Sequence, residues 1–167
     1  MKKNQLVFLL FGIITILYAC KKDSTGAPIT IFSTKFDNQA DLNAWTQSVG
    51  GKAVIDANSV KFDSITECYH FETLNLIPVQ KGKVYELKLT GKVNSSTSGD
   101  PGLCAGDFLI YVVQGSTNLI SESFGQYGLW TQKSYSFEAA SSAAVKIKFL
   151  VGTTRGAWID DLELIEQ

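Results

Sequence analysis

The stretch from Val84 to Val93 constrains the fold most, because apolar and polar residues alternate through nearly all of its ten positions. Its apolar side chains include Tyr85, Leu87 and Leu89, and the residues between them are charged or hydroxylated. A period of two places the apolar side chains on one face of a strand and leaves the other face in water. The stretch therefore predicts a β-strand in an antiparallel sheet with one buried face.

The same alternation recurs between Val145 and Val151 and around Tyr135 and Phe137, and polar, glycine-containing turns separate these runs. Apart from the first twenty residues, no segment repeats apolar side chains at helical spacing over three turns. About ten short strands of this kind predict an all-β fold, a two-sheet antiparallel β-sandwich. Further strands are expected at residues 30–36, 52–56 and 59–63, with a loop around Asp37, Asp41 and Trp45.

The first nineteen residues have the pattern of a secretory signal. Lys2 and Lys3 precede an apolar run of twelve residues, 6–17. As a helix this run would be about 18 Å long, too short for a bilayer core of about 30 Å. We therefore expect residues 1–19 to be a signal peptide and not a membrane span.

The signal ends in Leu-Tyr-Ala-Cys, which resembles the lipobox of bacterial lipoproteins and predicts lipidation of Cys20. An ordinary cleaved signal with an incidental cysteine is the alternative. Residues 20–28 would then form the lipidated end and a flexible tether, and residues 29–167 the folded domain. Lys21, Lys22 and Asp23 are similar to a signal for the outer face of the outer membrane, so the expected location is the outer membrane, on its periplasmic or surface-exposed face.

Composition excludes several functions. The net charge is −1 and no basic stripe occurs, so nucleic acid is not an expected partner. His70 is the single histidine, and no serine or cysteine motif marks a nucleophile beside it. We expect a protein that is not an enzyme.

The end of the chain, Gly156 to Leu164 (GAWIDDLEL), resembles the last strand of galactose-binding-like jelly-roll sandwiches, especially carbohydrate-binding modules of families four, nine and twenty-two. Phe36-Asp37 followed by Trp45, the central KGKVYEL at 81–87, and Trp130 before an aromatic strand match the same order. The resemblance implies a domain that binds carbohydrate.

The resemblance also implies a structural calcium ion, held by Asp160, by Asp37 and in some cases by Asp161, with nearby backbone carbonyls. Hard oxygen ligands of this kind suit Ca²⁺. Without the ion, Asp160 would hydrogen-bond a neighbouring loop and Asp161 would be solvated. Adjacent residues of a strand point to opposite faces, so the pair can act together only where a bulge turns one of them.

Once Cys20 is lipidated, Cys68 and Cys104 remain, and an exported compartment permits a disulfide between them. Such a bridge would stabilise the fold by roughly 4 kcal/mol on the chain-entropy estimate. Two buried thiols are the alternative.

Four aromatic residues that the core alternation does not require are candidates to stack against sugar rings: Tyr69, Tyr111, Tyr127 and Trp130. Packing in the core or at a sheet edge is the competing interpretation for each. His70, Glu122 and Arg155 are candidate polar partners. A glycan is the expected ligand; a structural or assembly lipoprotein that binds a partner protein is the alternative, and a small hydrolase or lyase is a third possibility.

Overall fold

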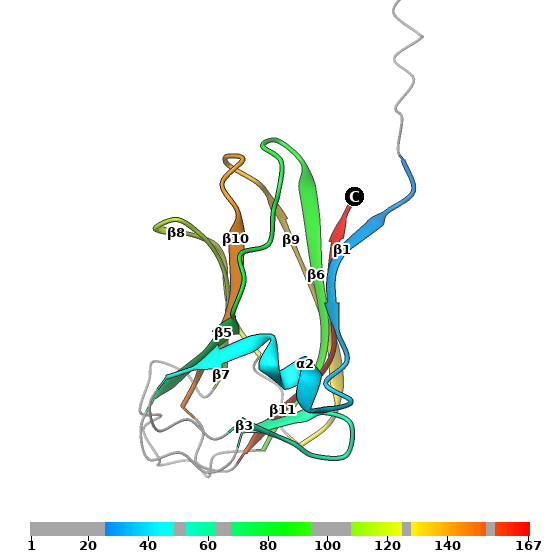
Figure 1. Cartoon of the computed structure of the whole chain (residues 1–167), viewed down its shortest axis with the longest axis vertical. Coiled ribbons are helices and arrows are strands. Elements are labelled where there is room, and N and C mark those ends of the chain that lie inside the picture. The colour runs from blue at the N-terminus through cyan, green and yellow to red at the C-terminus, as the bar shows by residue number, and fades with distance from the viewer. Residues whose placement is uncertain (1–25, 49–52, 63–67, 95–107, 125–127, 153–155) are drawn as a thin grey trace, which may run out of the picture.

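The computed structural model describes residues 26–48, 53–62, 68–94, 108–124, 128–152 and 156–167, which form two facing antiparallel sheets (Figure 1). This architecture confirms the expected all-β sandwich. The strands of this described part are β1 (Ile29–Thr34), β2 (Trp45–Gln47), β3 (Ala53–Ile55), β4 (Val60–Phe62), β5 (Tyr69–Thr73), β6 (Val84–Val93), β7 (Phe108–Gln114), β8 (Thr117–Ser123), β9 (Thr131–Glu138), β10 (Val145–Val151) and β11 (Ala157–Glu166).

The six-stranded sheet is built around β11. Its order is β3-β4-β11-β6-β9, and β1 also pairs with β11. The first half of β11 pairs with β4 and the second half with β1, while β6 runs along the other side of both halves. The register between β11 and β6 shifts between Asp160 and Glu163, and Asp161 has a positive φ of 45°. This irregularity is the bulge that the two adjacent acids required.

The five-stranded sheet has the order β2-β5-β10-β7-β8. Its central strands alternate strictly between buried and half-buried residues, and so does β6 in the other sheet. The inward side chains of β7 and β10 are aromatic or aliphatic apart from Gln114 at the end of β7, whereas the outward positions carry Lys146, Lys148 and Tyr111 together with Leu109, Val113 and Leu150. The described outer face of the five-stranded sheet therefore combines polar and apolar side chains, with the ring of Tyr111 near its middle.

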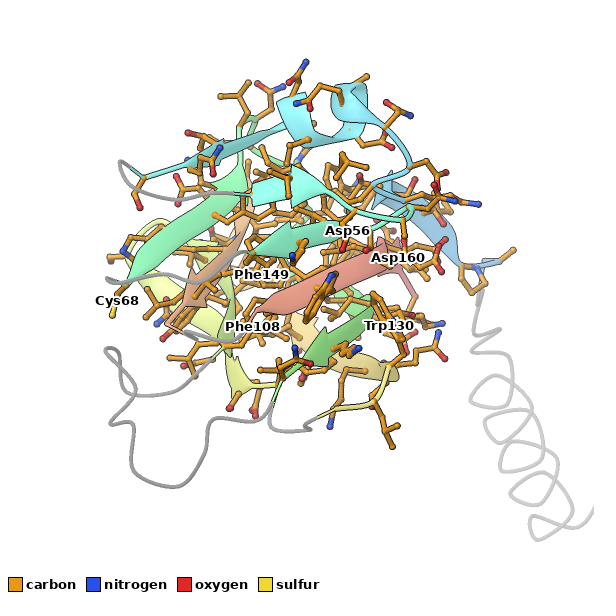
Figure 2. The ribbon with its side chains drawn as sticks, turned by 90° about the horizontal axis from the view of Figure 1, so that it is seen from below. Asp56, Cys68, Phe108, Trp130, Phe149 and Asp160 are labelled. Atoms are coloured by element: carbon orange, nitrogen blue, oxygen red, sulfur yellow. The ribbon has the colours of Figure 1, made fainter. Side chains whose placement is uncertain are left out.

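Aromatic rings fill the space between the sheets. Trp45 stacks on Phe71, with ring centroids 4.7 Å apart and an interplanar angle of 5°. Phe108 stacks on Phe149 at 5.4 Å, and Phe62 meets Phe71 edge to face at 5.1 Å. Figure 2 shows Phe108 and Phe149 in the interior of the sandwich. Ring pairs of this geometry add to the free energy gained from burial.

Two elements lie where a loop around Asp37, Asp41 and Trp45 was expected: strand β2 begins at Trp45, and a helix precedes it. A short helix, α2 (Gln39–Asn43), begins after Asn38, whose side chain accepts hydrogen bonds from the backbone N–H groups of Ala40 and Asp41. The Asp41 carboxylate accepts in return from the Asn38 N–H, which completes a capping box. In the described part of the chain, no helix is long and apolar enough to span a bilayer.

A candidate ligand groove on the five-stranded sheet

Two adjoining hollows, of 310 and 260 Å³, lie on the outer face of the five-stranded sheet. His70 and Lys148 line both hollows, so the two form one groove that runs from β2 to β8. The first hollow is also lined by Thr46, Gln47, Ser48 and Glu72, and the second by Tyr111, Val113, Asn118 and Leu150.

Strand pairing brings these residues together from distant parts of the chain. Lys148 lies opposite Glu72 on one side and opposite Tyr111 on the other, and Leu150 lies opposite His70. Residues directly opposite in antiparallel strands have Cβ atoms about 4.5–5.5 Å apart. A row of three side chains, Glu72–Lys148–Tyr111, therefore crosses the middle of the groove.

The polar groups of the groove are partly engaged with one another. Lys146 Nζ lies 2.6 Å from Glu72 Oε1, and Lys148 Nζ lies 3.9 Å from Glu72 Oε2. The backbone N–H of His70 donates to Ser48 Oγ at 3.0 Å. Burial and the neighbouring Lys148 charge lower the pKa of His70, although Glu72 opposes them, so the imidazole is neutral at pH 7. A neutral imidazole can both donate and accept a hydrogen bond.

Of the aromatic candidates whose side chains the structure describes, Tyr111 and Trp130, only Tyr111 lies in the groove. Tyr111 lines it, half-buried on β7. Trp130 is 47% exposed and immediately precedes β9, which pairs with β6, so it belongs to the other sheet (Figure 2). Tyr69 is the first residue of β5, and the orientation of its side chain is outside the described structure. Tyr127 and Arg155 lie outside the described residues, and Glu122 lies on β8 near Tyr135, away from the groove.

An aromatic residue of the six-stranded sheet that was not among the candidates, Trp158, is held by charged neighbours. The ammonium groups of Lys92 and Lys61 lie 5.1 and 5.8 Å from the centroid of its ring. Its indole N–H donates to Asp56 Oδ2 at 3.1 Å. These contacts satisfy both the indole N–H and the π-face of a half-buried ring. The alternation of residues along the sequence could have identified Trp158 as an outward position.

Two acids of the expected calcium site, Asp161 and Asp37, lie near enough to Asp160 for their charges to act on its carboxylate. Burial, the charge of Asp161 and the charge of Asp37 raise the pKa of Asp160, although its hydrogen bond from the Asp161 N–H (2.8 Å) opposes them. A group of carboxylates that repel one another suits a divalent cation. However, among the residues that the structure describes, no three acidic, histidine or cysteine side chains form a metal-binding group. Calcium here would depend on backbone carbonyls, and it stays a prediction.

Replacing Asp160 by asparagine tests this assignment. The folded-state pKa of Asp160 is raised, so ionisation above that pKa lowers stability, and at neutral pH the carboxylate opposes folding. In chelator we expect Asp160→Asn to raise the melting temperature slightly, within about 2 °C, by differential scanning fluorimetry. Added Ca²⁺ should stabilise the original chain and not the variant. Equal stabilisation of both would rule out Asp160 as a calcium ligand, and Glu138→Gln on exposed β9 is the matched control.

Of the two cysteines in the expected disulfide, only Cys68 lies among the described residues. Cys68 is exposed and directly precedes β5, and Figure 2 shows it at the opposite side of the molecule from Asp160. Cys104 and Cys20 lie outside the described residues. The bridge and the lipidation therefore stay predictions.

No protein-family model matches the sequence, and no curated protein matches it. Among solved structures, the CBM22-1 and GH10 modules of Clostridium thermocellum xylanase 10B with xylohexaose superpose with a TM-score of 0.60 at 14% identity, over 83% of this chain and 28% of that one. The module BiXyn10A CBM1 gives 0.60 at 13% identity, over 81% and 96% of the two chains. A Cellvibrio mixtus lichenase 5A module with cellotriose gives 0.52 at 8%, over 81% and 97%. The chain therefore has the β-sandwich fold of these carbohydrate-binding modules.

Proposed function

We propose that the protein binds a glycan chain in the groove of the five-stranded sheet, without catalysing its cleavage. The observation that carries this proposal is the placement of Tyr111 beside Lys148, His70 and Asn118 in one open hollow. The groove thus offers an aromatic ring together with hydrogen-bonding groups along its length.

This combination matches the chemistry of a sugar. A pyranose ring has an apolar face of C–H groups that can lie on an aromatic ring, and hydroxyls that both donate and accept hydrogen bonds. The groove supplies hydroxyls from Thr46 and Ser48 and amides from Gln47 and Asn118. An apolar protein partner would leave these groups without hydrogen bonds, which is costly. The polar lining therefore favours a glycan over a partner protein.

The similar structures support the same proposal in general terms. The xylanase modules are complexed with xylohexaose and the lichenase module with cellotriose. At 14% identity or less, the shared fold does not transfer a ligand, so the choice of glycan depends on the residues of this groove.

Affinity electrophoresis in gels containing xylan, cellulose derivatives or acidic polysaccharides tests the proposal. We expect Tyr111→Ala to weaken binding of any retained glycan about tenfold or more, because a ring that stacks at the centre of a site contributes most of its energy. Val54→Ala, at an exposed position of the other sheet, is the control and should leave binding unchanged. The proposal would be contradicted if the folded protein bound no glycan, or if Tyr111→Ala bound glycan as tightly as the original chain.

We further propose that Cys20 anchors this binding domain in the outer membrane, with residues 20–28 as the tether. The support is the signal pattern of residues 1–19 and the composition of the tether. Mass spectrometry of the membrane fraction should find Cys20 acylated, and a Cys20→Ser chain should leave that fraction. Recovery of an unacylated Cys20 in the soluble envelope fraction would contradict anchoring.

A further inference from the structure

The charges of the groove do not balance. Two ammonium groups, Lys146 and Lys148, face one carboxylate, Glu72, while His70 is neutral at pH 7. Among the described residues that line the two hollows or pair directly with them, these are the titratable groups besides Tyr111. The described charged groups of the groove, with Lys146 at its edge, therefore sum to +1 in a chain whose net charge is −1.

The excess charge belongs to Lys148. Lys146 Nζ donates to Glu72 Oε1 at 2.6 Å, the distance of a strong charge-assisted hydrogen bond. Lys148 lies 3.9 Å from the same carboxylate, which is too long for a hydrogen bond. An ammonium group has three donors, so Lys148 can still donate to a ligand.

The position of Lys148 relates this charge to the aromatic ring. It is the direct cross-strand neighbour of Tyr111, and both side chains line the 260 Å³ hollow with Asn118. A sugar ring lying on Tyr111 would direct the substituent at its edge toward Lys148. In a uronic acid that substituent is a carboxylate fixed directly to the ring.

We propose that the groove selects polysaccharides that carry carboxylated sugars, with Lys148 contacting the carboxylate of the sugar that lies on Tyr111. This inference rests on the proposed glycan binding and names its ligand class. Charge complementarity carries it: one uncompensated ammonium group matches one carboxylate per bound residue.

A matched pair of ligands isolates the carboxylate. Polygalacturonate and its fully methyl-esterified form share one backbone and differ in charge. For the full-length protein, isothermal titration calorimetry should give about tenfold tighter binding to the acid form, as expected when a hydrogen bond to a charged group is gained. The preference should shrink as salt is raised, because the pair is partly exposed.

Two substitutions should change the preference in opposite directions. Lys148→Gln keeps part of the stem but removes the charge, so it should abolish the preference for the acid form and leave similar affinities for the acid and the ester. Glu72→Gln removes the single carboxylate and should increase the preference. Lys88→Gln, on the other sheet and paired with Glu86 at 3.2 Å, is the control and should have no effect. Circular dichroism confirms that each variant is folded.

The outcomes separate the two proposals. Equal binding of the acid and the ester, with both weakened by Tyr111→Ala, would overturn the carboxylate preference and leave glycan binding intact. Tighter binding to dextran sulfate than to polygalacturonate would assign the groove to sulfated sugars instead. Failure to bind either form or neutral xylan would overturn both proposals.

Discussion

Replacing Phe71 by alanine is expected to lower the free energy of unfolding by about 3–5 kcal/mol, the range for removing a buried phenylalanine. The ring is 1% exposed and contacts Trp45, Phe62, Phe36 and Phe149. Its removal leaves a cavity that these large rings cannot readily fill. Chemical denaturation followed by tryptophan fluorescence measures the loss.

The same substitution should also weaken glycan binding, because Phe71 lies between His70 and Glu72 on β5, and both of those side chains line the groove. Phe71→Leu should cost less than alanine, since it keeps part of the volume. Leu74→Ala is the control: this residue follows β5 directly, is 55% exposed, and should change stability by less than about 0.5 kcal/mol. If Phe71→Ala lowered the free energy of unfolding by less than about 1 kcal/mol, well under the range for a buried phenylalanine, the packing described would be contradicted.

Replacing Gln114 by alanine is expected to cost about 2–3 kcal/mol, through the loss of hydrogen bonds that a buried side chain makes with backbone. Gln114 is 6% exposed at the end of β7. Its Nε2 donates to the carbonyls of Ser141 and Ala143 at 2.9 and 2.5 Å, and its Oε1 accepts from the Ser141 N–H at 3.1 Å. The side chain thereby fixes the turn between β9 and β10 onto β7.

Gln114→Met separates hydrogen bonding from volume, because methionine is similar in size and lacks the amide. It should be nearly as destabilising as alanine in thermal or urea unfolding. Gln132→Ala, at an exposed position of β9, should leave stability almost unchanged. If Gln114→Met proves as stable as the original chain, the hydrogen bonds to the turn contribute little.

Alternation along the sequence predicted the sandwich because it reports which face of a strand is buried. It placed Leu87 and Phe149 inside and Lys148 outside, as the structure has them. It could not reveal that Glu72, Lys148 and Tyr111 form one row, because strand order and register bring Lys148 beside residues that are 76 and 37 positions away in the sequence. The aromatic candidates were chosen by type, and of those whose side chains are described only Tyr111 lies in the groove.

Local exceptions to alternation were the other limit. The bulge at Asp161 requires a residue with positive φ within a strand. Aspartate tolerates positive φ better than most residues, but an aspartate in the sequence does not by itself predict that conformation. The helix α2 depends on a capping box of Asn38 and Asp41 in a segment too short to show helical periodicity. Both features lie beside Asp37, so the geometry of the acidic group could not be derived from the pattern.

The pairing of β1 with the second half of β11 has a mechanical consequence for a tethered protein. Ile29 lies opposite Glu166, so β1 begins at the end of the sandwich where the chain also finishes (Figure 1). A pull on the predicted anchor, resisted by a ligand held in the groove, would act along β1 and parallel to β11. The backbone hydrogen bonds between these strands would then be loaded together in shear instead of opening one at a time. Under such tension the lifetime of the fold is set by its unfolding rate. Loading the hydrogen bonds together would slow unfolding and so prolong attachment to a moving ligand.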